Sequence, residues 1–200
     1  MISDVIIVDD FLPASWHNAL RYEALKYLQY KYDDCTADRS FADQNTFDVG
    51  QFVCEILVFG QPKEHIKFND YFPSLMPIQY MAQNYLEDIL LIQPVRLKFN
   101  LMTQRPDAPI NSYNTPHHDA ISDCVSMLYY LNDSDGDTVF FNEKAADGSP
   151  EAFTIKGRVT PKANRAVIFD SSMYHASSQP RETAQRNVLN CIYRAQKLNG

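Results

Sequence analysis

The chain has 200 residues, of which 45% are hydrophobic and 22% charged, and a formal net charge of −7. These values are typical of a globular chain large enough to bury a core, and no apolar run approaches the roughly 18 residues of a membrane helix. A membrane partner is therefore not expected. A nucleic-acid partner is not expected either, because the lysines and arginines form no basic stripe.

The cysteine usage indicates a reducing compartment. Cys35, Cys54, Cys124 and Cys191 include no pair with C-x-x-C spacing, and we expect them to be reduced and mostly buried. Residues 1–10 contain acidic but no basic residues, unlike the start of a secretory signal. We therefore expect a cytoplasmic protein, and the sequence does not indicate its oligomeric state.

The first half of the chain mixes helical and strand patterns. We expect a strand at 5–8, a helix at 16–30 capped by Ser15, a polar loop at 33–50, a strand at 52–59 and a helix at 77–91. Pro94 is expected to end the second helix, and the long loop is a candidate lid. His17 on the first helix and His65 in a charged connector are interpreted as histidines that bind no metal.

After Pro94 the pattern changes to strands and turns. Residues 96–102 alternate, with Lys98, Asn100 and Met102 on one face, and further strands are expected at 124–131, 138–141, 153–155, 158–159, 166–169, 174–176 and 187–193. Helices followed by many short strands predict an α+β, mainly β fold, with a double-stranded β-helix (jelly roll) supported by N-terminal helices. We expect one domain, 1–200, with residues 1–94 as support and 95–195 as the jelly-roll core.

The segment Pro116-His117-His118-Asp119 contains a candidate metal site. Alternation along an extended strand places His117 and Asp119 on one face and His118 on the other. One imidazole and one carboxylate are two thirds of the facial triad that holds non-haem Fe(II). His175 follows a strand, so a jelly roll can bring it to the same place as the third ligand.

Arg186 opens the last expected strand and is a candidate anion-binding residue. A guanidinium on an inward strand is costly to bury unless it meets an anion, and its planar fork fits a carboxylate. The alternative is an arginine at the rim whose charged group stays in water.

The order His117-x-Asp119, Tyr130, Gly136-Asp137-Thr138, His175 and Arg186 resembles that of the 2-oxoglutarate- and Fe(II)-dependent dioxygenases. Within them, the prolyl 4-hydroxylase-like branch is the most similar. The resemblance spans residues 97–194, and residues 124–132 are especially similar to the strand that follows the first two ligands in prolyl hydroxylases.

This resemblance implies roles for five residues. His117, Asp119 and His175 would bind Fe(II), and Arg186 and Tyr130 would bind the distal carboxylate of 2-oxoglutarate. O₂ is the other implied cosubstrate, and ascorbate an optional reductant.

Two positions depart from the family pattern. Many relatives have a cosubstrate-contacting tyrosine on the strand before the first histidine, where this chain offers Asn100, Met102 or Thr103. The usual paired glycine is here Asp135-Gly136. Both departures concern the cosubstrate rather than the metal.

The implied activity is hydroxylation of an unactivated C–H bond, first of a prolyl residue in a peptide or protein. A free amino acid or another small metabolite is the alternative substrate. Two alternatives come from other classes: a metal-binding jelly roll without oxygenase activity, and an inactive interaction module whose histidines are structural.

Overall fold

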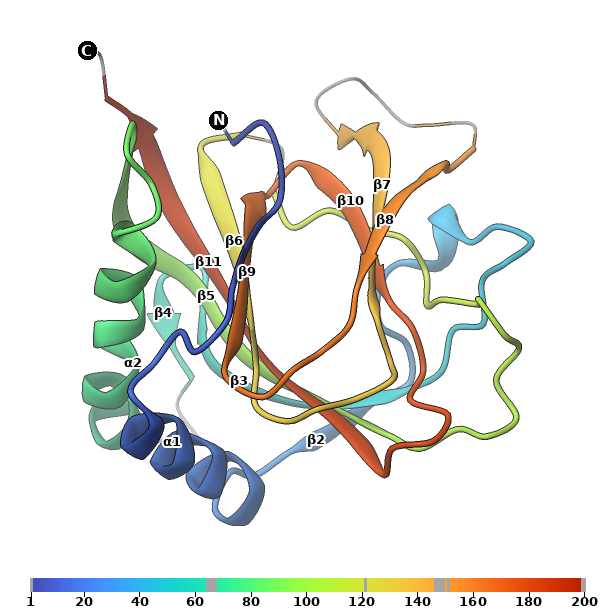
Figure 1. Cartoon of the computed structure of the whole chain (residues 1–200), viewed down its shortest axis with the longest axis horizontal. Helices are drawn as coiled ribbons and strands as arrows, with labels where there is room; N and C mark the ends of the chain where they lie inside the picture. The colour runs from blue at the N-terminus through green and yellow to red at the C-terminus, as the bar shows by residue number, and fades with distance from the viewer. Residues whose placement is uncertain (1, 64–67, 121, 146–149, 151, 199–200) are drawn as a thin grey trace.

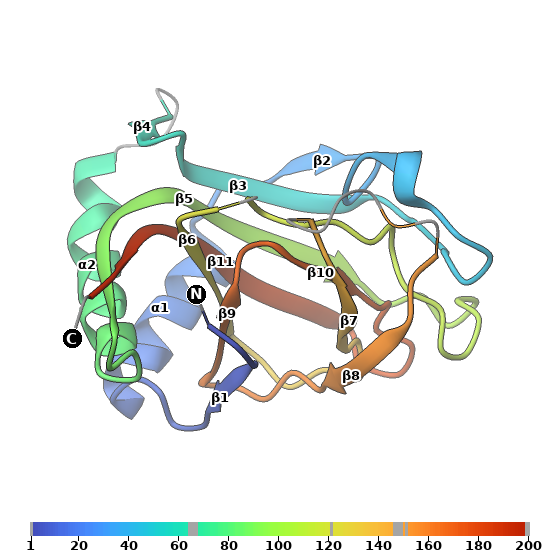
Figure 2. The ribbon, with the colours of Figure 1, turned by 90° about the horizontal axis from the view of Figure 1, so that it is seen from above.

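The fold is two facing β-sheets with two helices packed behind the larger sheet. The computed structural model describes residues 2–63, 68–120, 122–145, 150 and 152–198, and of residues 39 and 68–74 the backbone only. Figures 1 and 2 both place the helices on one side of the large sheet and the small sheet on the other. The predicted mainly β jelly roll with helical support is confirmed.

The larger sheet has eight strands, all antiparallel to their neighbours. Its order is β1 (Ile6–Val8), β9 (Arg165–Asp170), β6 (Cys124–Tyr130), β11 (Gln185–Lys197), β5 (Ile89–Thr103), β3 (Gln51–Val58) and β2 (Lys31–Asp33), with β4 (Gln61–Pro62) paired to β3. The smaller sheet is β10 (Met173–Ser177), β7 (Thr138–Lys144) and β8 (Ile155–Val159). The first half of the chain thus supplies strands as well as helices to the architecture.

Side-chain alternation along β6 explains how the large sheet contributes to two hydrophobic cores, one on each of its faces. Met127 and Tyr129 belong to the core under the helices, while Leu128 and Tyr130 belong to the core between the sheets. Every one of these side chains is nearly or fully buried. A strand apolar on both faces must be central, and β6 lies between β9 and β11.

Helix α1 (Ala14–Lys26) begins and ends earlier than predicted, and Ser15 is not its cap. Pro13 is the N-cap residue, and its carbonyl accepts the first bonds from the N–H groups of Trp16 (2.9 Å) and His17 (3.0 Å). Proline has no side-chain acceptor, so no side-chain cap forms there.

The predicted helix at 77–91 is wrong in both bounds, because α2 spans Phe68–Gln83. Pro77 therefore lies inside the helix, not in its first turn. The Gln83 side chain accepts from the N–H of Leu91 (2.8 Å) and donates to the carbonyl of Ile89 (2.7 Å), which ties the helix end to the start of β5. Ile89 and Leu91 are buried and Leu90 is exposed, a strand alternation that the helical interpretation overlooked.

Pro94 does not end a helix but lies within β5. It pairs with Tyr193 of β11 where the register between the two strands shifts, and such irregularities are where a sheet tolerates proline. The predicted strands at 153–155 and 158–159 form the single strand β8, those at 96–102 and 187–193 are parts of the longer β5 and β11, and the other predicted strands of the sheets are present with small changes of bounds. Strands β2 and β4 were not predicted.

The remaining predictions concern loops, histidines and cysteines. The polar loop at 33–50 is mostly irregular, with a short 3₁₀ helix at Arg39–Phe41. His65 and most of the predicted loop at 145–150 lie outside the described residues. The four cysteines are free, and no helix in the described part of the chain is long and apolar enough to cross a membrane.

Candidate metal centre

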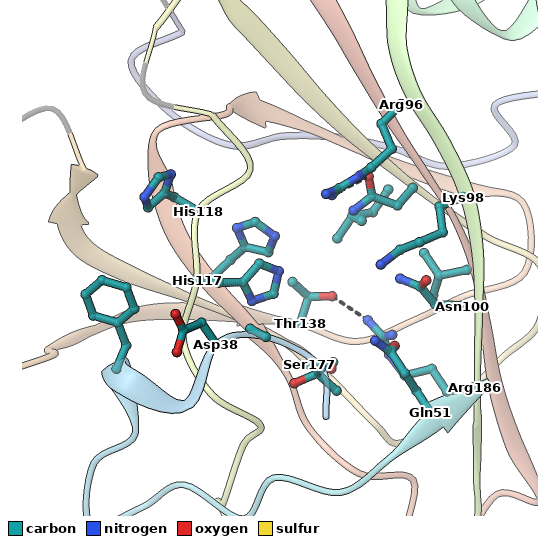
Figure 3. Close-up of a pocket in the computed structure, with 17 residues that line it drawn as sticks. Asp38, Gln51, Arg96, Lys98, Asn100, His117, His118, Thr138, Ser177 and Arg186 are labelled. Carbon is teal, nitrogen blue, oxygen red and sulfur yellow. Dashed lines mark hydrogen bonds between the residues drawn. The ribbon is translucent and has the colours of Figure 1, made fainter. Parts of the chain in front are cut away.

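A cavity of about 340 Å³ opens on the inner face of the large sheet, toward the small sheet. Its size falls in the low part of the usual range for small-molecule sites, roughly 300–1,000 Å³. Alternate residues of β5 (Arg96, Lys98, Asn100) and of β11 (Arg186, Val188, Asn190) line one wall. Figure 3 shows the labelled side chains of this wall facing His117 and Thr138 across the cavity.

The structure brings His117, Asp119 and His175 together. One nitrogen or oxygen atom from each lies within 4.8 Å of the others. The backbones of His117 and His175 form a bridge through two hydrogen bonds of 3.0 and 2.8 Å. The segment 116–119 is otherwise irregular rather than the expected strand, yet His117 and Asp119 still converge, because the bridge and a bond from the Asp119 N–H to the Ser171 carbonyl (3.0 Å) fix both residues.

Both histidines present one nitrogen as a free ligand atom. Nδ1 of His117 lies 3.3 Å from the carbonyl of Thr115, and Nδ1 of His175 lies 3.1 Å from that of Met173. An Nδ1–H that donates to a carbonyl leaves Nε2 unprotonated, as in metal-binding histidines. Nε2 of His175 is indeed buried without a hydrogen-bond partner in the described structure.

The electrostatics keep the two imidazoles neutral. Burial and the neighbouring His175 lower the pKa of His117 to about 3, and burial likewise lowers the pKa of His175. A metal binds only unprotonated imidazole. The donor set, two imidazoles and one carboxylate, therefore fits Fe(II) at neutral pH.

The side chain of Asp119 is fully buried, and its two oxygens have different partners. Nη2 of Arg96 donates to Oδ1, and the hydroxyl of Ser126 donates to Oδ2 at 2.6 Å. Burial opposes ionisation, but the charge of Arg96, helped by the hydrogen bond from Ser126, outweighs it and holds the pKa of Asp119 below its usual range. The carboxylate is therefore charged and oriented before a metal arrives.

The other histidines stay outside the cluster. His118 lines the cavity, but its ring stands edge-on to Tyr174 with the centroids 5.3 Å apart. His17 is buried under the sheet, with Nδ1 2.6 Å from the hydroxyl of Tyr129. Because the segment 116–119 is not a regular strand, His118 lies at the same cavity as His117 rather than on an opposite face, although its ring is not part of the cluster.

Arg186 is buried at the end of the cavity without an acidic partner among the described residues. Its Nε donates to the carbonyl of Gly136 and its Nη2 to the hydroxyl of Thr138, both at 2.8 Å. Only 4% of the residue is exposed. A buried guanidinium with two neutral acceptors retains donors for an incoming anion.

Tyr130 lies behind Thr138 rather than on the cavity surface. Its hydroxyl is 2.7 Å from the Thr138 hydroxyl, and the Arg186 guanidinium lies over its ring at 5.7 Å. Thr138 lines the cavity, whereas Tyr130 is not among the lining residues. Direct contact of Tyr130 with a cosubstrate thus stays a prediction.

Among the three residues considered for the missing tyrosine, Asn100 is the one that lines the cavity. Its Oδ1 is buried without a hydrogen-bond partner in the described structure. Met102 is buried and 3.9 Å from the amide nitrogen of Asn114, and Thr103 is exposed.

The sequence interpretation missed Arg96, Lys98 and Ser126 as parts of this site. Arg96 and Lys98 share the inward face of β5 with Asn100. Ser126 lies on the same face of β6 as Leu128, a residue that lines the cavity, and its hydroxyl donates to Asp119. Strand alternation, already used for β5 and β6, was the signal that could have found all three.

Comparison with known proteins confirms the resemblance. Residues 107–194 match the model of the 2OG-Fe(II) oxygenase superfamily. That segment includes His117, Asp119, His175 and Arg186 but not the β5 residues Arg96, Lys98 and Asn100. No curated protein matches the chain.

Solved structures share the fold across nearly the whole chain. An oxidoreductase of the 2OG-Fe(II) oxygenase family from Burkholderia pseudomallei is 15% identical, with a TM-score of 0.64 over 98% of this chain and 87% of its own. The α-ketoglutarate-dependent epimerase SnoN of nogalamycin biosynthesis is 12% identical, with a TM-score of 0.59 over 98% and 81%. A prolyl hydroxylase from Trichoplax adhaerens, solved with a hypoxia-inducible factor peptide, is 14% identical, with a TM-score of 0.57 over 95% and 83%.

Proposed function

We propose that this chain is a 2-oxoglutarate- and Fe(II)-dependent oxygenase that hydroxylates an unactivated C–H bond. The observation that carries the proposal is the convergence of His117, Asp119 and His175, because the two histidines line the same cavity as Arg186, which is buried without an acidic partner among the described residues. A metal-binding module without oxygenase activity accounts for the first group but gives Arg186 no purpose.

In this proposal the protein supplies binding and orientation. His117 and His175 would hold Fe(II) through Nε2, and Asp119 would hold it through a carboxylate that Arg96 and Ser126 orient. Bound Fe(II) supplies the oxidation: 2-oxoglutarate and O₂ become succinate and CO₂, and one oxygen atom enters the C–H bond.

Arg186 binds the distal carboxylate of 2-oxoglutarate, with Thr138 beside it. Tyr130 acts on that carboxylate through Thr138, whose hydroxyl it contacts at 2.7 Å. Asn100, on the cavity wall with an unpaired Oδ1, takes the place of the tyrosine that many relatives use.

The substrate proposal has two branches. A prolyl residue in a peptide is suggested by the sequence resemblance, and a prolyl hydroxylase shares the fold. A small molecule is favoured by the cavity volume of about 340 Å³.

Thr36, Ala37 and Asp38 line the cavity mouth, so we propose that the loop at 33–50 acts as its lid. Free cysteines support a cytoplasmic location.

The test is to mix the purified protein anaerobically with Fe(II) and 2-oxoglutarate and to record the visible spectrum. We expect the charge-transfer band of a 2-oxo acid bound to Fe(II), and succinate formation once air is admitted. Adding or omitting ascorbate then tests its role as a reductant.

Arg186→Leu should weaken the band at limiting 2-oxoglutarate, whereas Arg194→Leu should not. Arg194 is the matched control because it lies on the same strand with its side chain exposed. A protein that binds iron but gives neither band nor succinate would contradict the proposal.

A further inference from the structure

Lys98 is a cationic residue of the cavity, and the proposed function assigns it no contact with Fe(II) or 2-oxoglutarate. It projects from β5 into the cavity between Arg96 and Asn100 (Figure 3). In the sheet it pairs with Asn190 of β11 and with Glu55 of β3.

No acidic side chain in the described structure forms an ion pair with Lys98. Glu55, the nearest acid by strand register, pairs instead with Lys63 at 3.5 Å, and Asp119 is bound by Arg96. Burial and the charge of Arg96 lower the pKa of Lys98. An ammonium group held in a cavity without a counter-ion is unfavourable, and an anionic ligand relieves that cost.

The charges of the loaded site leave Lys98 without compensation. Asp119 offsets Arg96, and the two carboxylates of 2-oxoglutarate are more than matched by Fe(II) and Arg186. Among the described residues, Asp38 is the acid that lines the cavity, and it is exposed. The site thus keeps room for one more negative charge beside Lys98.

Lys98 also lies outside the segment that matches the superfamily model, residues 107–194. The match to the superfamily model therefore assigns no role to Lys98.

We propose that Lys98 binds a carboxylate of the hydroxylated substrate, which makes the substrate a small carboxylic acid such as a free amino acid. This inference rests on the proposed oxygenase function and selects between its two substrate branches. A residue inside a peptide has no main-chain carboxylate to offer, and the cavity volume favours a small molecule.

The experiment uses the protein loaded with Fe(II) and saturating 2-oxoglutarate. The common L-amino acids and small dicarboxylic acids are each compared with the matching carboxamide, and a proline-containing peptide is included, with succinate as the readout. We expect at least one free acid to stimulate succinate formation, with kcat/KM about tenfold or more above that of its amide, the scale of one lost charged contact.

Lys98→Met should abolish the preference of acid over amide by raising KM about tenfold, and Lys31→Met should not. Lys31 is the control because it is an exposed lysine at the far edge of the same sheet. A readout without turnover is calorimetric binding of the stimulating acid to the anaerobic complex, which Lys98→Met should weaken by a similar factor while the charge-transfer band stays.

Three results would overturn the inference. They are equal stimulation by acids and amides, an unchanged preference in Lys98→Met, and no stimulation by any free acid in a protein that forms the charge-transfer band. Stimulation by the peptide alone belongs to the third result and selects the peptide branch. If the band itself does not form, the proposed function fails before Lys98 is tested.

Discussion

Arg96 binds the carboxylate of Asp119 from the cavity wall, so a strand outside the ligand-bearing segment controls a candidate metal ligand. Nη2 of Arg96 donates to Oδ1 while the Ser126 hydroxyl holds Oδ2 at 2.6 Å. The Asp119 side chain has no exposed surface. Its orientation is therefore set by these partners rather than by water.

Removing Arg96 should weaken metal binding. Arg96→Leu leaves one oxygen of a buried carboxylate without its partner, and loss of such supporting contacts usually costs 10–100-fold in metal affinity. We expect a loss of about tenfold for Mn(II) or Fe(II) in a competition titration. Arg96→Lys should lose less, and Arg194→Leu nothing. Tighter binding in Arg96→Leu would instead mean that Arg96 competes with the metal for Asp119.

The adjacent histidines should differ sharply in their effect on metal content. His117→Ala removes one of three clustered donors, whereas His118→Ala removes a ring that packs against Tyr174. We expect His117→Ala to lose bound iron after desalting and His118→Ala to keep it, as measured by elemental analysis. Equal losses would show that the cluster depends on His118 as well.

Three substitutions along the Arg186 chain of contacts should have graded effects on 2-oxoglutarate binding. Arg186→Leu removes the anchoring charge, and truncating one partner of a buried charged pair costs about 2–5 kcal/mol. We expect its dissociation constant to rise about a hundredfold or more. Thr138→Val should cost about tenfold because it removes the hydroxyl that accepts from Arg186 and contacts Tyr130.

Tyr130→Phe is the informative variant of this series, because Tyr130 reaches Arg186 through Thr138. We expect a weakening of about threefold or less, since only the bond to Thr138 is lost. A loss as large as that of Arg186→Leu would instead place the Tyr130 hydroxyl directly on the cosubstrate.

Gly136 should not tolerate a side chain, since its carbonyl accepts from Arg186 Nε in a crowded turn. A Cβ there would lie 2.8 Å from the carbonyl oxygen of Ser178 and 2.9 Å from the nitrogen of Pro180. Gly136→Ala should destabilise the fold by about 1–3 kcal/mol and weaken 2-oxoglutarate binding. Gly157→Ala is the control because a Cβ there meets nothing within 4 Å.

The sequence predicted the strands well where they alternate and poorly where local signals conflicted. The face of β5 that bears Lys98 and Asn100 followed from period-two alternation alone. The end of α2 did not, because Ile89 fits a helical stripe as well as a strand, and the bonds of the Gln83 side chain that favour the strand are tertiary contacts. Hydrophobic periodicity is a local property of the sequence and does not predict such tertiary contacts.

Residue chemistry and spacing were enough to name His117 and Asp119 as candidate ligands, but their convergence depends on the bridge to His175 and the bond to Ser171 rather than on strand alternation. The partners of Asp119 were not identified, although Arg96 and Ser126 are on inward faces that alternation defines. The position of Tyr130 behind Thr138 could not be deduced, since it depends on how β7 packs on β6 across the two sheets.

Acid should destabilise this protein partly through Asp135, whose carboxylate holds the turn before Arg186. It accepts from the N–H groups of Arg181 (2.9 Å), Glu182 (2.8 Å) and Thr183 (3.0 Å), and from the Thr183 hydroxyl (2.6 Å). Burial opposes ionisation, but these hydrogen bonds outweigh it and lower the pKa of Asp135 to about 2.

A folded-state pKa below the unfolded value of about 3.9 means that ionised Asp135 stabilises the native state. That contribution is complete above about pH 5 and is lost as the pH falls toward 2. Asp135→Asn should lower the free energy of unfolding by roughly 1.5–3 kcal/mol at pH 7, the range for hydrogen bonds to a charged group. The difference from wild type should shrink as the pH falls.

Urea unfolding at a series of pH values from 7 to about 3 measures this difference. Glu87→Gln is the control, because Glu87 is exposed after α2 and its substitution should leave the unfolding free energy nearly unchanged. A gap between wild type and Asp135→Asn that stays constant down to pH 3 would mean that the carboxylate charge does not stabilise the turn.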